Sequence, residues 1–218
     1  MTERRSRIRG SAVATGRGDD GTTGLLYGGE RIFKDDARAE AYGTIDEAVA
    51  ALGLARAELG LMRRYGVLPS AFAGSTDLVL RLQRELFVAG AELAANGAAW
   101  DRLEDGTTRV SEAMVTGLEE VLADLEQHVG VPREFVVPGE TRLSAAFEVA
   151  RTVVRRAERR AVTLQRAGLL PGEWLLAYLN RLADLLWVLA RAAEAAETVP
   201  PTPVRTQPRE RRRTEPAR

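Results

Sequence analysis

The chain has 218 residues, of which 45% are hydrophobic and 28% charged, as expected for one soluble globular domain with tails. It contains no cysteine, which excludes disulfides, zinc–thiolate sites and thiol nucleophiles. The only histidine, His128, lies near a predicted helix end, where a surface or capping role is commoner than that of a ligand or base. There is no run of 18 apolar residues, and Arg4-Arg5 precedes no apolar stretch. These features predict a cytoplasmic protein with no membrane span and no export signal.

The formal net charge is zero, but the charge is unevenly distributed along the chain. Residues 1–10 and 198–218 hold ten of the 31 basic residues and only three of the 31 acidic ones, so the body is acidic. An acidic body is a poor nucleic-acid binder, because phosphate contacts need clustered cations. We expect a disordered basic N-terminus over 1–12 and one domain over 13–197. A disordered tail is expected over 198–218, which holds five of the nine prolines.

Five stretches show apolar residues at a spacing near 3.6, typical of amphipathic helices. None shows the alternation of an exposed strand, so the predicted fold class is all-α, a five-helix bundle over 35–197. The helices are expected after Asp35-Asp36, from about Ser75, near Ser111, after Pro138-Gly139, and with Pro171 at the opening of the last.

A glycine-rich segment, residues 13–34, precedes the first helix and cannot itself be helical. It contains "TGRGDDGTTG" from Thr15, and glycines of this kind let backbone N–H groups approach a phosphate closely. A flexible surface loop is the alternative interpretation. The match to G-x-G-x-x-G is not a dinucleotide fingerprint here, because no strand and helix of a βαβ unit flank it.

The fourth predicted helix carries a row of arginines, in which Arg151 and Arg155 project from one side. Such a row can bind phosphate oxygens through forked donors, although a solvated face with ion pairs is the alternative. Asn180 interrupts the apolar surface of the fifth helix, and Asp46 lies near the apolar side of the first. Lys34 is the one lysine among 31 basic residues, which favours a specific role for it.

Taken in order, these segments resemble the PduO-type ATP:cob(I)alamin adenosyltransferases over about residues 13–197. The resemblance rests on five motifs in the expected order and spacing: "TGRGDDGTTG" from Thr15, "KDDARAEAYGTIDE" from Lys34, "FVVPG" from Phe135, "RTVVRRAERR" from Arg151 and "YLNRLADLLWVLAR" from Tyr178.

The resemblance implies a homotrimer of five-helix bundles, with ATP and corrinoid bound where two subunits meet. It implies that residues 13–34 wrap the triphosphate. It also implies that Asp46 pairs with an arginine of the fourth helix across the interface, and that Phe135 lies beneath the corrin ring. The residues so implied for catalysis are Arg151, Arg155, Asp46 and Phe135, and those for ATP binding are Thr15, Gly16, Arg17, Gly18, Thr22, Thr23, Gly24, Lys34, Arg155, Arg156, Glu158, Arg159 and Asn180.

The activity implied is transfer of the 5′-deoxyadenosyl group of ATP to cob(I)alamin, with Mg²⁺ accompanying the nucleotide. A flavin-dependent reductase and an adenosylcobalamin-dependent enzyme are the expected partners. The alternative is a non-catalytic homologue that delivers or senses the cofactor. The chain departs from the family pattern at Val49, at Glu140 and Glu148 near the expected corrinoid side, and by lacking an aromatic residue around Val199.

Overall fold

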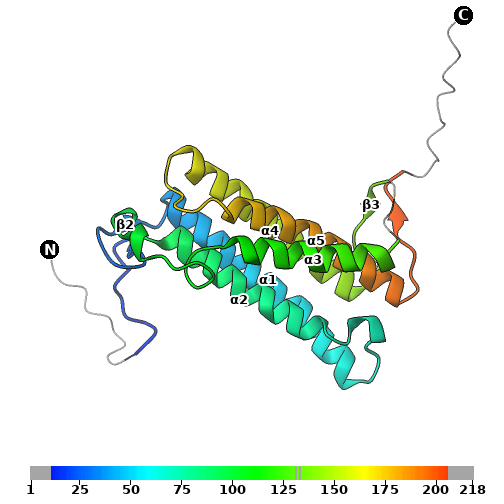
Figure 1. Ribbon diagram of the computed structural model, residues 1–218. Helices are drawn as coiled ribbons and strands as arrows, with labels where there is room; N and C mark the ends of the chain where they lie inside the picture. Colours follow the sequence, from blue (N-terminus) through cyan, green and yellow to red (C-terminus); the bar gives the residue numbers. More distant parts are fainter. Residues whose placement is uncertain (1–10, 131, 133, 206–218) are drawn as a thin grey trace, which may run out of the picture.

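The computed structural model describes residues 11–130, 132 and 134–205, and the two expected basic tails lie largely outside this range. Five α-helices account for most of the described chain, which confirms the all-α bundle (Figure 1). They are α1 (Ala37–Arg64), α2 (Ser75–Ala94), α3 (Glu112–His128), α4 (Arg142–Arg166) and α5 (Leu175–Ala196).

The helices begin where local chemistry favours a start. Asp36 caps α1 by accepting the backbone N–H of Arg38, and Thr141 caps α4 by accepting that of Ser144. The expected starts of the first four helices are therefore confirmed to within a few residues. Pro171 is the exception, because α5 begins at Leu175 and this proline lies in the loop before it.

The helices run lengthwise, with α1 packed between α2 and α4, and α5 between α4 and α3. The neighbours α3 and α5 run in the same direction, whereas the other packed pairs are antiparallel (Figure 1). Their predicted apolar faces form one core, which includes Leu52, Leu86, Phe147 and Leu182, all fully buried. Only two residues of α3, Val115 and Leu118, are buried, so it is the most peripheral helix. No helix in the described ranges is both long and apolar enough to cross a membrane.

Two short antiparallel ladders lie at opposite ends of the bundle (Figure 1). At one end β1 (Thr22–Thr23) pairs with β2 (Ile32–Phe33) inside the glycine-rich segment. At the other, β3 (Val136–Val137) pairs with β4 (Thr202–Pro203). Ordered structure thus extends past the boundary that composition predicts at residue 197, because the backbone of 202–203 finds hydrogen-bond partners in β3.

Candidate functional site

The glycine-rich segment folds into a hairpin-like loop in which several glycines adopt a conformation that other residues avoid. Gly16 has φ +68° and Gly21 has φ +80°. Between them, Asp20 accepts hydrogen bonds from the backbone N–H and the hydroxyl of Thr22, at 2.9 and 2.8 Å. These bonds hold the pKa of the Asp20 carboxyl below its usual range, the backbone bond having the largest effect. Asp20 is therefore an ionised brace inside the loop.

Lys34 closes this loop from its far end. Its ammonium donates to the carbonyl of Gly18 at 2.8 Å, and its backbone N–H donates to the carbonyl of Gly21 at 2.9 Å. A Cβ added at Gly18 would lie 2.9 Å from the Lys34 nitrogen, so only glycine leaves the ammonium in place. The only lysine of the chain thus points into the loop that composition singled out for phosphate binding.

Arg31 is a site residue that the sequence motifs did not reveal. Its Nε donates to the Thr22 hydroxyl at 2.7 Å, and one Nη donates to the carbonyls of Arg17 and Thr22 at 2.8 and 3.0 Å. A single guanidinium therefore ties the two sides of the loop together. No residue pattern marks this role, because two of the three acceptors are backbone carbonyls.

The loop is attached to the bundle at the end of α2. Leu26 exchanges backbone hydrogen bonds with this region, and the Asn96 side chain donates to the carbonyl of Gly28 at 2.8 Å. From α1, the buried Arg38 donates to the carbonyl of Ala95 at 2.6 Å. These hydrogen bonds attach the glycine-rich segment to the end of α2, so the position of the segment depends on that end of the helix.

A buried carboxylate, Glu92, stabilises that end of α2. Its side chain is 0% exposed, and it accepts the backbone N–H groups of Val110 at 2.7 Å and Gly172 at 3.2 Å. Burial raises the pKa of Glu92 to about 7, against the opposing effect of the two backbone bonds and of Arg109. Glu92 thus joins α2 to the loops that precede α3 and α5.

Four neighbouring arginines in the middle of α4 divide into two groups. Arg156 pairs with Glu47 and Arg160 with Glu40 at 3.2 Å, so these two join α4 to α1 of the same chain. Arg155 and Arg159 are exposed, and Arg159 donates to the backbone carbonyl of Arg155 at 3.0 Å. Within the described residues, neither forms an ion pair. Of the arginines implied for ATP, Arg155 and Arg159 are thus available to a ligand, whereas Arg156 already has a carboxylate partner.

The remaining predicted polar residues lie on two surfaces. Glu158 accepts a long hydrogen bond, 3.4 Å, from the Asn180 amide, which brings these two together between α4 and α5. Asp46 is exposed on α1 and has no ion-pair partner within the described chain. Arg151 instead binds Glu148 of its own helix at 2.6 Å. The expected contact of Asp46 with an α4 arginine is therefore absent from the described part of a single chain.

Phe135 precedes β3 and is 88% exposed. It does not plug the end of the bundle, which is the plain interpretation of a lone aromatic residue at a helix connection. Its carbonyl accepts the backbone N–H of Val204 at 2.9 Å, so the β3–β4 ladder fixes its backbone while the ring stays outside the core. An exposed ring held on an ordered ladder is available to an external apolar surface.

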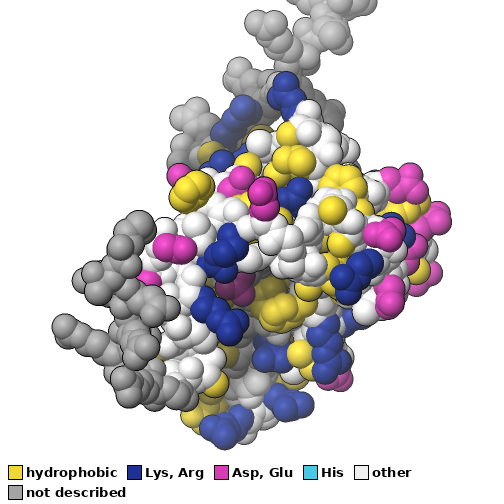
Figure 2. Space-filling view, turned by 90° about the vertical axis from the view of Figure 1, so that its left-hand side faces the viewer, with side chains coloured by type: hydrophobic (Ala, Val, Ile, Leu, Met, Phe, Trp, Pro, Cys, Tyr) yellow, Lys and Arg dark blue, Asp and Glu magenta, His cyan; other side chains and the backbone are white. Residues whose placement is uncertain are grey.

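The two ends of the bundle thus carry different parts of the candidate site (Figure 1). The glycine-rich segment lies at the end where α2 finishes, and Phe135 lies at the end where α2 begins. The 20 residues of α2 separate the two by roughly 30 Å at 1.5 Å per residue. Figure 2 views the end with the glycine-rich segment and shows basic side chains gathered around a hollow.

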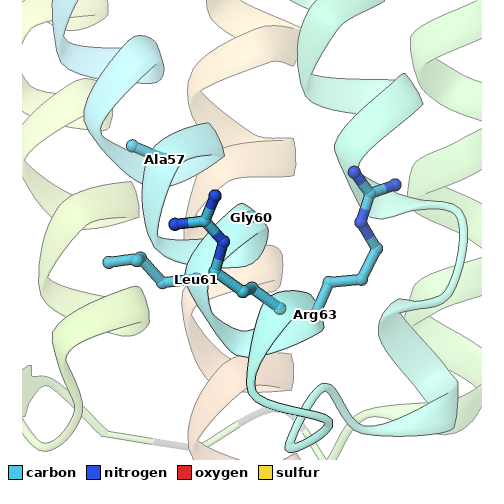
Figure 3. A pocket seen from close by; sticks show the side chains of 5 residues that line it. Ala57, Gly60, Leu61 and Arg63 are labelled. Atoms are coloured by element: carbon cyan, nitrogen blue, oxygen red, sulfur yellow. The ribbon is translucent and has the colours of Figure 1, made fainter.

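A second hollow lies on the outer face of α1 (Figure 3). It is lined by Ala57, Gly60, Leu61, Arg63 and Arg64, near the C-terminus of the helix. This face also carries the exposed Leu54, and Asp46 and the small Ala50 continue it toward the other end. Small exposed residues allow another helix or chain to approach closely.

The fold and the site define an all-α bundle that bears a glycine-rich loop closed by a lysine, together with exposed arginines, which are donors that suit phosphate oxygens. Comparison with known proteins identifies the family of this bundle. The family model described as cobalamin adenosyltransferase matches residues 13–193.

Individual relatives agree with this match. A corrinoid adenosyltransferase of Citrobacter freundii is 38% identical over 192 residues, covering 86% of this chain and 97% of the relative. One of Bacillus subtilis is 36% identical, covering 83% and 86%. Among solved structures, a variant PduO-type ATP:corrinoid adenosyltransferase of Lactobacillus reuteri complexed with cobalamin and ATP matches with a TM-score of 0.73 and 29% identity. It covers 88% of this chain and 98% of that one.

The chain belongs to the cobalamin adenosyltransferase family. It is a corrinoid adenosyltransferase of the PduO type, a transferase that carries out ATP-dependent adenosylation of cobalamin.

Proposed function

We propose that transfer takes place in a site completed by two copies of the chain, one contributing the glycine-rich segment and the other the exposed arginines of α4. The observation that carries this proposal is the placement of the predicted residues. The glycine-rich segment and Phe135 lie at opposite ends of one bundle, and Asp46 and Arg155 are exposed with no ion-pair partner in the described part of their own chain.

The outer face of α1 supports close approach of a second copy. It carries Asp46, Ala50, Ala57 and Gly60, and the hollow of Figure 3 continues it. In a ring of three copies, each chain contacts one neighbour through one surface and the other neighbour through a different surface, as a closed heterologous interface requires. We therefore propose a homotrimer in which Asp46 of one copy meets an arginine of α4 of the next.

The chemistry proposed for this site needs cations and no general base. The cobalt(I) lone pair attacks C5′ of ATP, the C5′–O bond breaks, and the electron pair leaves on the triphosphate. Negative charge develops on the leaving oxygen, and preorganised donors lower the barrier most at that point. Lys34, the loop amides and Arg155 are the proposed donors, and the hydroxyls of Thr22 and Thr23 lie on the same loop.

Magnesium would arrive with the nucleotide. Across the described ranges, no group of three or more acidic or histidine side chains is arranged to hold a metal ion. Mg²⁺ is commonly bound through substrate phosphates with few protein ligands, which fits a loop rich in hydroxyls and amides. Delivery of reduced corrinoid by a flavin-dependent reductase, and release to an adenosylcobalamin-dependent enzyme in the cytoplasm, complete the proposal.

Turnover is tested by mixing the protein with ATP, Mg²⁺ and chemically reduced cobalamin. The expected result is loss of the cobalt(I) spectrum with stoichiometric release of triphosphate. ATP and corrinoid binding without either change would instead indicate a carrier.

The shared site is tested by complementation between two inactive variants, Lys34→Ala and Arg155→Ala. Each impairs a different half of the site, so a mixed trimer contains interfaces where both halves are intact. Random mixing makes about one interface in four intact, and roughly a quarter of the wild-type activity should return after co-refolding. A site contained in one chain predicts no recovery at any mixing ratio.

A further inference from the structure

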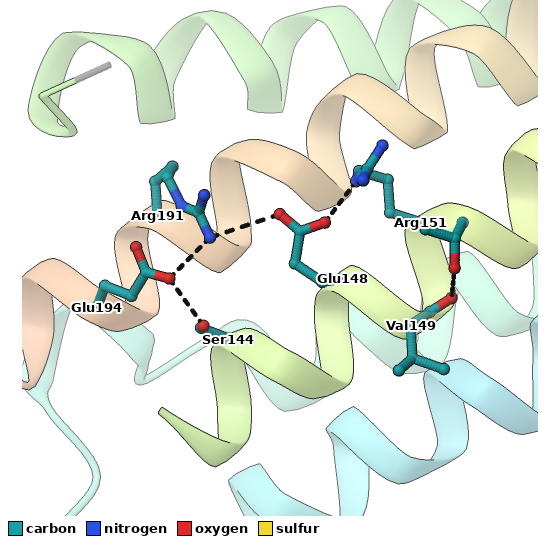
Figure 4. Close-up of polar contacts among 7 residues, drawn as sticks. Ser144, Glu148, Val149, Arg151, Arg191 and Glu194 are labelled. Carbon is teal, nitrogen blue, oxygen red and sulfur yellow. Dashed lines mark hydrogen bonds and ion pairs between the residues drawn. The ribbon is translucent and has the colours of Figure 1, made fainter. Parts of the chain in front are cut away.

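A row of charged side chains leads from Arg151 into the buried interface between α4 and α5 (Figure 4). Arg151 binds Glu148 at 2.6 Å, and Glu148 in turn meets Arg191 of α5 at 3.4 Å. Arg191 also binds Glu194 at 2.7 Å, and Glu194 accepts the hydroxyl proton of Ser144 at 2.8 Å. The signs alternate, so the four charges cancel.

Burial of the side chains increases along this row. The side chains of Glu148, Arg191 and Glu194 are 6%, 2% and 1% exposed, whereas that of Arg151 is 24% exposed. Buried charges persist only when they are paired and hydrogen-bonded, so the three inner groups depend on one another. Arg151 is the partly exposed end of this row of side chains and lies at the protein surface.

Glu148 occupies the position that connects these two environments. Its two carboxylate oxygens bind different arginines, one buried and one partly exposed. The contact with Arg151 uses the Nε edge of the guanidinium, and within the described residues neither Nη group of Arg151 has a hydrogen-bond partner. Two donors therefore remain for an anion that comes from outside the chain.

We propose that Glu148 is a positioning residue for the transfer reaction. Anchored by Arg191, it holds Arg151 in one orientation so that the Nη groups meet a phosphate oxygen of ATP in the site. This inference rests on the proposed function, because it assigns Arg151 to the nucleotide. Preorganisation of this kind affects the transition state more than folding, since a guanidinium fixed beforehand needs no reorientation as charge develops.

The test compares Glu148→Gln with Glu194→Gln in the full chain. Both carboxylates are buried and both bind Arg191, but only Glu148 touches Arg151. Both variants should lower the melting temperature. Glu148→Gln should also lower kcat about tenfold with saturating corrinoid, whereas Glu194→Gln should keep kcat within about twofold. Equal losses of kcat in the two variants would assign Glu148 a purely structural role and overturn the proposal.

A double-mutant cycle of Glu148→Gln with Arg151→Ala gives an independent readout. If Glu148 acts through Arg151, removing it after Arg151 is gone should change kcat less than about twofold. Additive losses contradict the inference. If Glu148→Gln does not fold, Glu148→Asp replaces it in the test. Aspartate keeps the negative charge, but its shorter side chain does not extend as far toward Arg151. This variant should fold and have a lower kcat.

Failure of the proposed function is recognised separately. In that case mixing Lys34→Ala with Arg155→Ala restores no activity, and equilibrium binding of ATP becomes the deciding measurement for Glu148. Glu148→Gln should then weaken ATP binding relative to Glu194→Gln, and equal affinities would overturn the inference.

Discussion

The ammonium of Lys34 donates a hydrogen bond at 2.8 Å to the carbonyl oxygen of Gly18, which lies 16 positions earlier in the sequence. The contact fixes the only lysine of the chain above a segment whose amides and hydroxyls suit a triphosphate. Because a carbonyl and a phosphate oxygen would compete for the same ammonium, this bond gives the cation a defined resting position that nucleotide binding can exchange.

Substituting Gly18 by alanine should displace Lys34 without unfolding the protein. The new Cβ would lie 2.9 Å from the lysine nitrogen and 3.1 Å from the carbonyl of Thr22. The lysine end is flexible and can move aside, so we expect a small change in melting temperature and a rise in the KM for ATP of about tenfold. Gly74→Ala is the control, since no atom lies within 4 Å of its added Cβ. Similar KM values for both variants would contradict the prediction.

Glu92 predicts a pH dependence of stability with a definite sign. Its pKa in the folded protein, about 7, lies above the ordinary value of 4.5. Between these values the folded state binds more protons than the unfolded state, so the contribution of Glu92 falls as pH rises from 4.5 to 7. The full effect is about 3 kcal/mol.

The measurement is urea unfolding of wild type and Glu92→Gln at pH 5 and pH 8. The glutamine cannot ionise, so the variant should lose less stability than the wild type over this range. Its stability relative to the wild type should rise by up to about 3 kcal/mol between the two pH values. A constant difference at both pH values would show that Glu92 does not titrate there.

Gly172 is fixed by the same carboxylate. A Cβ at this position would lie 2.4 Å from an oxygen of Glu92, and that side chain is enclosed. We expect Gly172→Ala to cost about 1–3 kcal/mol of unfolding free energy, as overpacking commonly does. Adding Glu92→Asp, which shortens the acid, should recover part of the loss in a double-mutant cycle. Strictly additive effects would indicate that the two residues do not clash.

Truncation separates the C-terminal ladder from the residues beyond it. Removing 201–218 eliminates β4 and the N–H of Val204 that binds the carbonyl of Phe135. Removing 206–218 leaves both. We expect only the longer truncation to weaken corrinoid turnover, with ATP affinity unchanged in both, measured as KM for each substrate. Equal corrinoid KM values in the two truncated proteins would show that β4 does not support Phe135.

The helices and the core could be predicted from the sequence because each depends on local periodicity. The predicted apolar face of α4 repeats at helical spacing, and its residues are buried: Phe147, Ala150, Val154, Ala157, Ala161 and Leu164. The site was predicted less completely. The roles of Arg31 and Glu92 depend on backbone groups of distant loops, and a backbone group carries no residue identity. Glu92 did leave a signal, since a lone acid among the apolar residues "AGAELAA" needs a partner.

The ladder between β3 and β4 was missed for a related reason. It joins residues 65 and 67 positions apart in the sequence, and β4 contains Pro203 within a proline- and arginine-rich stretch. Composition alone predicts no order there. Pairing nonetheless occurs because an edge position tolerates the missing N–H of proline while the neighbouring Val204 still donates.

The exposure of Phe135 turns its substitution into a test of the corrinoid site. A ring that is 88% exposed buries little area within one chain, so Phe135→Ala should leave the melting temperature nearly unchanged. If the ring occupies the space of the lower axial ligand of cobalt, the variant should lose adenosylation that starts from cobalt(II) and a mild reductant. It should retain much of the activity with pre-formed cobalt(I), because the ring would assist reduction and not alkyl transfer.

The deciding quantity is the ratio of the two activities, with Val137→Ala as a control on the same ladder. Equal losses with both cobalt states, in a variant of normal stability, would mean that Phe135 binds the corrin without acting on its axial ligand.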